Sequence, residues 1–349
     1  MAVRNKVGFA VVGLGNIARN SILPAFANCK KATLVALVSR KKKKALKLAA
    51  EFGARFWYSV DEFGTCLTDP QVSAVYIATP PGEHADLTVR SAQAGKHVLC
   101  EKPLAATVAE SVRMVDACRE HGVRLMTAYR KYFEPAALCL KGLIRDKRLG
   151  RIDMIHTSFS ELFTPGVSPA WLLDPALAGG GPMMDLGVYC VNTTRWLVDE
   201  DPVEASALSW RHNAARFRNV EEGISFRLSF RSGLVVEGSS TYSAAMSSFI
   251  FVQGTKGWAS LTPAFPFEYE RTVTGQIAGR KFERKFRVLD EFALEIDAFA
   301  SAILEDKNVE PDGVEGYRDM AILDSIYESA RNLRPVAINY FQGGQPLGA

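Results

Sequence analysis

The chain has 349 residues, of which 48% are hydrophobic and 23% charged, and its net charge is +4 at pH 7. This length exceeds the size at which one hydrophobic core usually keeps growing, so we expect two domains. The composition is that of a soluble globular protein and excludes a disordered chain. Much of the net charge comes from the short run Arg40 to Lys44, which has no interleaved aromatic residues, so nucleic-acid binding is not expected.

The start of the chain and its cysteines indicate a cellular location. The segment Met1 to Lys6 is short and polar, and the apolar stretch Val7 to Val12 is too brief for a signal sequence or a membrane span. The six cysteines lie apart without a C-x-x-C pair, which favours reduced thiols. We therefore expect a cytoplasmic protein with no membrane partner. The five histidines form no pattern that places two ligands on one helical face, so no metal site is predicted.

Short apolar runs alternate with helical patterns in the first third of the chain, as is typical of parallel strands joined by crossover helices. Helices are expected over Lys42 to Phe52 and over Ala85 to Ala94, each ended by a glycine. Capping boxes at 59–62 and 107–110 mark two further helix starts. The pattern predicts an α/β fold with a doubly wound parallel sheet. The expected strands are Val7 to Val12, Thr33 to Val38, Ala74 to Ala78, His97 to Cys100 and Arg124 to Ala128.

After about Ala128 the apolar residues alternate in twos, which indicates antiparallel strands with one solvated face. We expect these strands to form a meander, and we expect a helix from Pro182 to about Leu197 and two C-terminal helices over Glu291 to Leu304 and Val314 to Leu333. This predicts domains at residues 1–128 and 129–349, the second of them α+β. The expected strands are Ile155 to Leu162, Val203 to Trp210, Ile224 to Phe230, Leu234 to Ser240, and Ile250 to Trp258 broken by Gly254.

A glycine turn, Gly13-Leu14-Gly15-Asn16-Ile17-Ala18, follows the first expected strand directly and opens a helix. In this context the first glycine permits a tight turn and the second lets the backbone approach a pyrophosphate. The phosphates would meet the unpaired N–H groups and the positive dipole end of the helix. A turn that only packs is the less favoured alternative. The candidate cofactor-binding residues here are Gly13, Gly15, Asn16 and Ile17.

The end of the second expected strand indicates which dinucleotide is bound. An NAD site places Asp or Glu there, on the ribose 2′-hydroxyl, whereas this chain has Ser39 and Arg40. A guanidinium suits a 2′-phosphate, since it makes charge-assisted paired hydrogen bonds. We therefore predict NADP(H). For the lysines that follow, Lys41 to Lys44, a solvated helix face is the favoured interpretation.

Two further loops follow expected strands and so lie at the edge where open α/β sheets bind ligands. Thr79-Pro80-Pro81 follows one strand and Glu101-Lys102-Pro103 another, and the bond before Pro103 is a candidate cis peptide. A lysine at this edge can polarise a substrate oxygen or lower a neighbour's pKa, although a rim lysine taken alone is more often a surface charge.

The second expected domain contains a matching pair of polar residues. We expect 179–182, Gly-Gly-Gly-Pro, to be a flexible lead into a helix that places Asp185 and Tyr189 on one face. A tyrosine near a lysine ammonium can have its phenol pKa lowered enough to exchange a proton with a hydroxyl or carbonyl. Without the first domain these residues would be read as a helix-surface pair.

Together these motifs resemble the glucose-fructose oxidoreductase, inositol dehydrogenase and rhizopine catabolism protein (Gfo/Idh/MocA) family over nearly the whole chain. The motifs are Gly-x-Gly-x-x-Ala, Thr-Pro-Pro-x-x-His at 79–84, Glu-Lys-Pro at 101–103, Tyr-Arg at 129–130 and Gly-Gly-Gly-Pro-Met-Met-Asp-Leu-Gly-Val-Tyr at 179–189. The resemblance implies an N-terminal NADP-binding Rossmann domain and a C-terminal α+β domain with a large, mostly antiparallel sheet. It also implies hydride transfer at nicotinamide C4, and homo-oligomers, dimer or tetramer, that associate through this sheet.

The resemblance also implies roles for single residues. Lys102 matches the catalytic lysine, and Asp185 matches the acid one turn before the usual catalytic histidine, where this chain has Tyr189. The tyrosine resembles the branch with glucose-fructose oxidoreductase, xylose or glucose dehydrogenases and dihydrodiol dehydrogenase. Tyr132 stands where that branch commonly has a histidine, so substrate preference is expected to differ. Cofactor contacts are implied for Thr79, Pro80, His84, Glu101, Lys102 and Arg130, with His84 supporting its loop.

Our sequence-based hypothesis is oxidation of a cyclic aldose at C1 to a lactone, or the reverse carbonyl reduction, with NADP(H). Lys102, Asp185 and Tyr189 would contact the substrate, and Trp171 would either wall the sugar site or belong to the core. Alternatives are an oxidoreductase that retains NADP(H) between two sugars, a trans-dihydrodiol or carbonyl reductase, and a non-catalytic NADPH or sugar sensor. The first is ranked lower because the few residues before Val7 offer no arm to wrap a cofactor.

Overall fold

The computed structural model describes residues 6–342 and 345–346, and its contacts divide the chain into two units. The first unit comprises Met1–Arg130 and Asp290–Tyr317, and the second comprises Lys131–Leu289 and Arg318–Ala349. The first boundary lies two residues beyond the one expected from sequence. The segment Asp290–Tyr317, expected in residues 129–349, groups instead with the first unit. The segment before Lys6, on which the expectation about the chain start depends, falls almost wholly outside the described residues.

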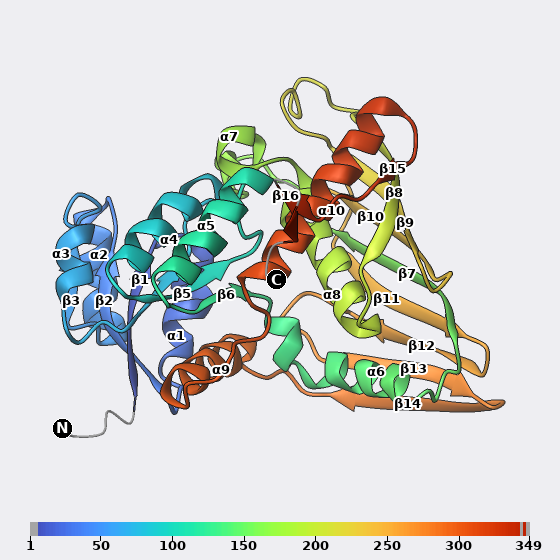
Figure 1. The fold of residues 1–349 in the computed structure, drawn as a ribbon, viewed down its shortest axis with the longest axis horizontal. Helices are drawn as coiled ribbons and strands as arrows, with labels where there is room; N and C mark the ends of the chain where they lie inside the picture. The colour runs from blue at the N-terminus through green and yellow to red at the C-terminus, as the bar shows by residue number, and fades with distance from the viewer. Residues whose placement is uncertain (1–5, 343–344, 347–349) are drawn as a thin grey trace. The chain divides into compact units, whose positions relative to one another are not determined.

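A six-stranded parallel sheet with the order β3-β2-β1-β4-β5-β6 forms the centre of the first unit (Figure 1). Its strands are β1 Val7–Val12, β2 Ala32–Val38, β3 Phe56–Tyr58, β4 Ala74–Ile77, β5 His97–Glu101 and β6 Leu125–Ala128. The predicted doubly wound sheet is confirmed. The sequence analysis missed β3, because this half-buried edge strand is only three residues long and its Phe-Trp-Tyr run is too short to show a period.

Helices cover both faces of this sheet. Helices α4 and α5 pack together on one face, whereas α9 contacts β1, β2 and β5 on the other (Figure 1). The reciprocal hydrogen bonds of both predicted capping boxes are present: the N–H groups of Ser59 and Thr107 donate to the side chains of Glu62 and Glu110, whose own N–H groups donate back to the hydroxyl oxygens. The box at Thr107 caps α5 directly, whereas α3 begins only at Phe63, after the box. The helices are α1 Leu23–Ala25, α2 Lys42–Phe52, α3 Phe63–Thr68, α4 His84–Gln93, α5 Val108–Glu120 and α9 Glu291–Leu304, with the π-helical turn η1 Ala18–Ile22 and the 3₁₀ turns η2 Pro81–Glu83 and η3 Arg130–Phe133.

The second unit is built on a nine-stranded sheet with the order β14-β13-β12-β11-β7-β10-β9-β8-β15. The expected meander is wrong: β7 lies in the middle, pairing in parallel with β10 and antiparallel with β11. The stretch around Gly254 is two strands, β11 and β12, because the chain turns back at 255–256. The strands are β7 Ile152–Ser160, β8 Pro202–Trp210, β9 Gly223–Phe230, β10 Val235–Thr241, β11 Ser247–Gly254, β12 Gly257–Thr262, β13 Arg271–Ile277, β14 Arg280–Phe286 and β15 Val336–Ala337.

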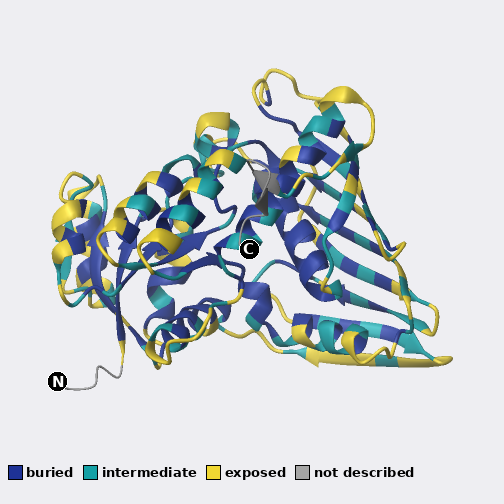
Figure 2. Cartoon of the chain, viewed as in Figure 1, coloured by how far each residue is buried: buried dark blue, intermediate teal, exposed yellow. Residues whose placement is uncertain are grey.

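Helices α6 and α8 contact one face of this sheet, and buried residues alternate mainly with half-buried ones along β7, β9 and β10 (Figure 2). The opposite face carries a groove of about 560 Å³ between the strands and the end of α10. The helices are α6 Pro135–Arg145, α7 Pro175–Ala178, α8 Val188–Val198 and, from Arg318 onward, α10 Gly313–Asn332, with the turns η4 Ala170–Leu173 and η5 Met183–Gly187. Strands β16 Phe341–Gln342 and β17 Gln345–Pro346 form a short ribbon. No helix among the described residues is long and apolar enough to cross a membrane.

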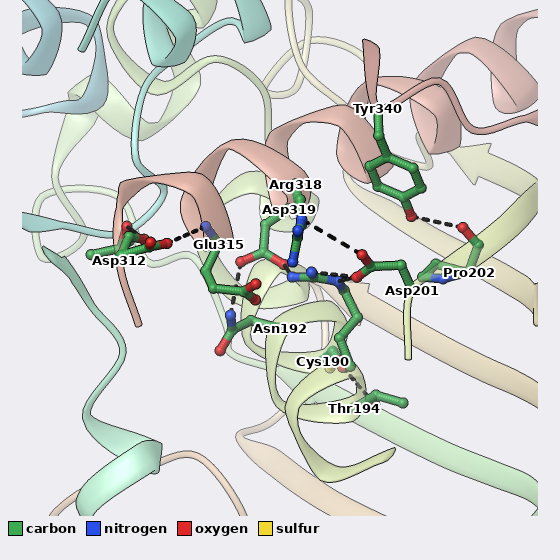
Figure 3. Close-up of polar contacts among 12 residues, drawn as sticks. Cys190, Asn192, Thr194, Asp201, Pro202, Asp312, Glu315, Arg318, Asp319 and Tyr340 are labelled. Carbon is green, nitrogen blue, oxygen red and sulfur yellow. Dashed lines mark hydrogen bonds and ion pairs between the residues drawn. The ribbon is translucent and has the colours of Figure 1, made fainter. Parts of the chain in front are cut away.

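A buried charge network joins α8 to α10 (Figure 3). Asp319 of α10 accepts hydrogen bonds from Asn192 Nδ2 at 2.8 Å and from Arg195 Nη1 at 2.7 Å. Asp319 is fully buried and Arg195 is 3% exposed. Arg195 also donates through Nε to Asp201 at 2.7 Å. Because a buried arginine is costly without anions, this network fixes the carboxyl-terminal half of α8 to α10.

We expect the substitution Asp319→Asn to destabilise the fold by about 3 kcal/mol, since it removes one charge of a buried pair and leaves Arg195 poorly compensated. Urea unfolding of the full chain measures this loss. Asp116→Asn is the control, because Asp116 pairs with Arg119 on the surface of α5 at 2.8 Å and should change stability by less than about 0.5 kcal/mol. Equal stability of the two variants would contradict the assigned role of the network.

Candidate functional site

The glycine turn of the first unit lies directly after β1. Gly13 has a φ of +88°, and a Cβ there would stand 2.6 Å from the carbonyl oxygen of Ala78, so the chain's own packing requires glycine. A Cβ at Gly15 would meet nothing within 4 Å. Glycine at this second position is therefore not explained by packing within the protein. It fits the close approach of a ligand, as a dinucleotide pyrophosphate requires.

The helical segment that starts at Asn16 follows this turn at once, and Arg19 N–H donates to the carbonyl oxygen of Gly15 at 3.1 Å. The N–H groups of the first helical turn, including those of Asn16 and Ile17, have no acceptor within the helix and are available to an anion. The segment continues as a π-helical turn, η1.

Positive charge gathers beside the turn, at the start of α2. This helix begins at Lys42 with no acidic residue in its first turn and no side chain capping it. Burial, followed by the charges of Arg19 and Lys41, lowers the pKa of Lys44. Positive side chains at a helix amino terminus are repelled by the positive end of the helix dipole, so a bound anion would stabilise the start of α2. Arg19 was not identified from sequence, because its role depends on the approach of η1 to α2.

Ser39 and Arg40 occupy the predicted place after β2. Ser39 Oγ accepts a hydrogen bond from the N–H of Lys41 at 3.2 Å, which shapes the start of α2. The Arg40 side chain is 74% exposed, and its Nη2 donates to Glu83 Oε1 at 3.2 Å. Glu83 belongs to η2, the turn after β4. The Arg40–Glu83 pair was not expected from sequence, because the two residues come from different loops.

His84 lies between the two other predicted loops. Its buried ring lies with Nε2 2.8 Å from the carbonyl oxygen of Thr79 and Nδ1 3.1 Å from that of Leu104. Burial lowers the pKa of His84. A neutral imidazole carries a single N–H and donates to one of these two carbonyl oxygens, so the buried ring packs between the Thr79 loop and the loop that carries Lys102 and bonds one of them. The bond between Lys102 and Pro103 is cis, as the sequence allowed. Pro80, next to Thr79, is half-buried.

Glu101 points into the interior of the first unit. Tyr76 Oη lies 3.1 Å from Glu101 Oε1 and 3.4 Å from Glu295 Oε2, while the N–H of Lys102 donates to Glu101 Oε2 at 3.2 Å. Burial raises the pKa of Glu101. Burial and then the Glu101 charge raise the pKa of Glu295 well above its usual range. Both acids beneath the loop of Lys102 therefore ionise less readily than an exposed glutamate.

Arg130 completes this buried cluster. Its Nε lies 3.1 Å from Glu291 Oε2, and its guanidinium lies 5.6 Å from the centre of the Phe292 ring. The side chain is 7% exposed. The structure thus places this predicted cofactor-binding residue in an ion pair with α9, inside the first unit.

The expectation of a flexible glycine run in the second unit is wrong. A Cβ at Gly180 would stand 2.2 Å from Tyr327 Oη, and one at Gly181 would stand 2.5 Å from the carbonyl oxygen of Glu221. Gly179 has a φ of +79° and ends α7. These glycines allow close packing of the backbone rather than motion, because other parts of the unit fill the space of their missing side chains.

A buried carboxylate caps the helix that follows the glycines. Glu221 accepts hydrogen bonds from the N–H groups of Gly181 and Met183, both at 3.0 Å, and from Tyr327 Oη at 2.8 Å. These N–H groups precede the first full helical turn and would otherwise lack acceptors. Burial raises the pKa of Glu221. The sequence analysis did not find this residue, since no pattern relates it to a helix start some 40 positions away.

Asp185 lies in η5, a π-helical turn, and Tyr189 lies in the first turn of α8. Tyr242 Oη donates to Asp185 Oδ2 at 2.9 Å. Burial, followed by the Asp185 charge, raises the pKa of Tyr242 well above its usual range, so its hydroxyl remains a donor. The π turn changes the angular offset that an α-helix would give these residues. Neither the π turn nor the Tyr242 contact was predicted.

Aromatic rings hold Tyr189 in the second unit. Its ring stacks on Phe265 with 5.8 Å between centres and meets Phe159 edge-on at 6.0 Å. The residue is only 5% exposed. These contacts restrict the ring, and therefore the position of its hydroxyl. Trp171 lies half-buried in η4, so the structure leaves open both interpretations of this residue.

The comparisons with known proteins identify the family. A model described as the oxidoreductase family with an NAD-binding Rossmann fold matches residues 7–129, and one described as the GFO/IDH/MocA C-terminal domain matches residues 138–260. The chain belongs to the Gfo/Idh/MocA oxidoreductase family. The predicted resemblance and fold class of this Gfo/Idh/MocA member are therefore confirmed.

Three relatives match nearly the full length of this family member. D-xylose 1-dehydrogenase [NADP(+)] of Haloarcula marismortui is 31% identical over 342 residues, which is 97% of this chain and 95% of the relative. D-xylose 1-dehydrogenase (NADP(+)) 2 of Haloferax volcanii is 31% identical over 327 residues, with 92% and 97% covered. The crystal structure of aldose-aldose oxidoreductase from Caulobacter crescentus, complexed with glycerol, is 34% identical with a TM-score of 0.91 and covers 95% of this chain and 100% of its own.

We expect the substitution Tyr242→Phe to lower kcat by about tenfold, because it removes a hydrogen bond to a charged carboxylate that orients Asp185. KM for NADP+ should stay unchanged, since Tyr242 belongs to the second unit. Tyr340→Phe is the control: Tyr340 Oη donates to the carbonyl oxygen of Pro202 at 2.7 Å, away from Asp185. Steady-state kinetics and thermal unfolding separate the effects, and equal kcat in the two variants would rule out a positioning role for Tyr242.

The raised pKa of Glu295 predicts how stability depends on pH. Ionising Glu295 costs more free energy in the folded protein than in the unfolded chain. The free energy of unfolding therefore falls as the pH rises from the ordinary pKa of a glutamate toward the raised pKa of Glu295 in the folded protein. Glu295→Gln, which mimics the protonated acid, should melt higher than the parent at pH 8, with the difference narrowing toward pH 5. Thermal unfolding across this range measures it.

Glu305→Gln is a control of opposite sign. Hydrogen bonds from Lys31 and Lys307 lower the pKa of Glu305 to about 2, so this carboxylate contributes stability that is lost as the pH falls. The variant should therefore melt no higher than the parent at pH 8. A Glu295→Gln effect independent of pH would contradict the raised pKa of Glu295.

Proposed function

We propose that this chain is an NADP(H)-dependent oxidoreductase that oxidises a cyclic aldose at C1 to the lactone. The observation that carries the proposal is the match over nearly the full chain, at 31% and 34% identity, to NADP-dependent xylose dehydrogenases and to an aldose-aldose oxidoreductase. The open space at Gly15 and the basic start of α2 fit the cofactor independently of that match. A non-catalytic sensor is disfavoured, because Lys102, Asp185 and Tyr189 are all present.

Residues of the first unit would hold NADP(H). The backbone of Gly13 to Ile17 would take the pyrophosphate, and Ser39 with Arg40 would take the 2′-phosphate. The loops of Thr79 and Lys102, with His84 packed between them, would line the nicotinamide side of the sheet edge. Glu101 and Arg130 would act from inside the unit. Glu101 would fix the loop that carries Lys102, and Arg130 would fix the residues that follow β6.

Bound NADP+ supplies the acceptor for a hydride from C1 of the sugar. In the forward direction Tyr189 Oη would take the proton of the C1 hydroxyl, so that the C–H and O–H bonds break and a C=O bond forms. The Lys102 ammonium would bind the substrate oxygen and favour the tyrosinate. Asp185, held by Tyr242, would orient the substrate hydroxyl. That these residues serve one substrate rests on the motif match.

A homo-oligomer, formed through the open face of the nine-stranded sheet, is part of the proposal. This face carries Leu208 at 60% exposure and, at the end of α10, Leu333 at 74%. Phe251 lies on it between His156 and Trp258, with ring centres 6.4 Å and 5.5 Å away. Exposed aliphatic side chains beside half-buried aromatic rings on one face favour burial by a second copy. A cytoplasmic location, with reduced cysteines, also remains a proposal.

A second candidate is a cycle in which NADP(H) stays bound while one aldose is oxidised and another carbonyl reduced. The similarity to an aldose-aldose oxidoreductase favours it. Nucleotide that co-purifies with the chain and survives gel filtration, and that is oxidised by an added aldose or ketose without release, would select this cycle over the ordinary dehydrogenase.

An absorbance screen at 340 nm tests the proposed reaction, with NADP+ or NAD+ against aldoses, inositols and trans-diols. We expect turnover with an aldose and NADP+, and weaker turnover with NAD+. Tyr189→Phe and Lys102→Ala should each lower kcat by about 10² or more while leaving NADPH binding by Tyr189→Phe intact. Absence of turnover with every substrate would contradict the dehydrogenase, and an unaffected Tyr189→Phe enzyme would refute proton transfer by Tyr189.

A further inference from the structure

Glu83 is a charged residue at the sheet edge to which the family motifs give no role. Its carboxylate lies 3.2 Å from Arg40 Nη2, and its side chain is 32% exposed. The residue ends η2, and His84 follows it directly. The two ring nitrogens of the buried His84 lie within hydrogen-bond distance of the carbonyl oxygens of Thr79 and Leu104. The backbone of Glu83 is therefore anchored, and its carboxylate is presented to Arg40 from a fixed loop.

We propose that Glu83 sets the preference of this chain between NADP(H) and NAD(H), by placing a negative charge on the guanidinium that the 2′-phosphate would use. This rests on the proposed function, in which Arg40 binds the 2′-phosphate. The acid that NAD sites carry at the end of the second strand is absent at Ser39 and Arg40. The loop after β4 instead brings a carboxylate to within 3.2 Å of the Arg40 guanidinium from another part of the chain.

The two cofactors meet Glu83 with opposite results. The 2′-phosphate of NADP(H) is an anion, so it competes with the carboxylate for Arg40 and is repelled by it. The 2′-hydroxyl of NAD(H) is neutral and can donate a hydrogen bond to the carboxylate. Glu83 therefore weakens NADP(H) binding and strengthens NAD(H) binding, so that the difference in affinity between the two cofactors becomes smaller. Arg40, Lys41 and the start of α2 keep the balance on the side of NADP(H).

Equilibrium binding tests this without turnover. Fluorescence titrations of the full chain with NADPH and NADH are compared with displacement by 2′,5′-ADP and 5′-AMP, which lack the nicotinamide. For Glu83→Gln we expect the Kd of NADPH to fall about two- to fivefold and that of NADH to rise by a similar factor, the range that one exposed charge pair allows. 2′,5′-ADP should follow NADPH, and the difference should shrink at 0.5 M salt.

Asp86→Asn is the matched control. Asp86 lies three residues further along and pairs with Arg113 at 3.0 Å, so the substitution removes the same charge from a neighbouring exposed pair. It should leave the ratio of the two Kd values unchanged. An equal shift in Asp86→Asn and Glu83→Gln would show a general charge effect and overturn the proposal.

Arg40→Gln separates the inference from its premise. If this variant loses NADPH affinity while Glu83→Gln leaves the ratio unchanged, Arg40 binds the phosphate but Glu83 does not set the preference. Weaker NADPH binding by Glu83→Gln would mean that the carboxylate orients Arg40, and would also overturn the proposal. If Arg40→Gln leaves NADPH and 2′,5′-ADP binding unchanged, the proposed phosphate site is wrong and the inference falls with it.

Discussion

The carboxylate of Glu221 is the contact on which the geometry of the second unit depends. It accepts the N–H groups of Gly181 and Met183 and is itself held by Tyr327 of α10. The same helix supplies Asp319, which binds the far end of α8. The segment that carries Asp185 and Tyr189 is thus fixed at both ends by buried anions. Because both carboxylates are buried, losing either contact would leave a polar group without a hydrogen-bond partner. This cost favours a single position for the segment that carries Asp185 and Tyr189.

In the first unit the loops need a different kind of support, since a parallel sheet brings the carboxyl ends of six strands to one edge without fixing the loops that follow them. The buried ring of His84 packs between two of these loops, and burial raises the pKa of the two acids beneath the Lys102 loop. The basic start of α2 leaves an electrostatic site that an anion completes. Rigid loops and an excess of positive charge suit a cofactor whose phosphates must be held in one position while its nicotinamide ring faces a substrate.

The sequence predicted those features that depend on neighbours along the chain. The period of apolar residues located β1, β2, β4, β5 and β6, and local chemistry located the glycine turn and both capping boxes. It failed where contacts join distant segments. No periodic signal in the sequence indicates that β7 pairs in parallel with β10 or that α9 returns to the first sheet. The same holds for the hydrogen-bond partners of Gly181 and Asp185. The charged edge strand β14 was missed because its only apolar residues, Phe282 and Phe286, lie four positions apart and none of its residues is buried.

The central claim is that this chain moves hydride from C1 of an aldose to NADP+. Single turnover of the full chain with NADP+ and a C1-deuterated aldose such as D-xylose tests it directly, with both products followed by NMR or mass spectrometry. We predict one deuterium at nicotinamide C4 of the NADPH formed and one equivalent of lactone, with the rate lowered by the heavier isotope if bond breaking limits turnover. Reduced cofactor without deuterium, or a bound aldose that leaves NADP+ unreduced, would contradict the account.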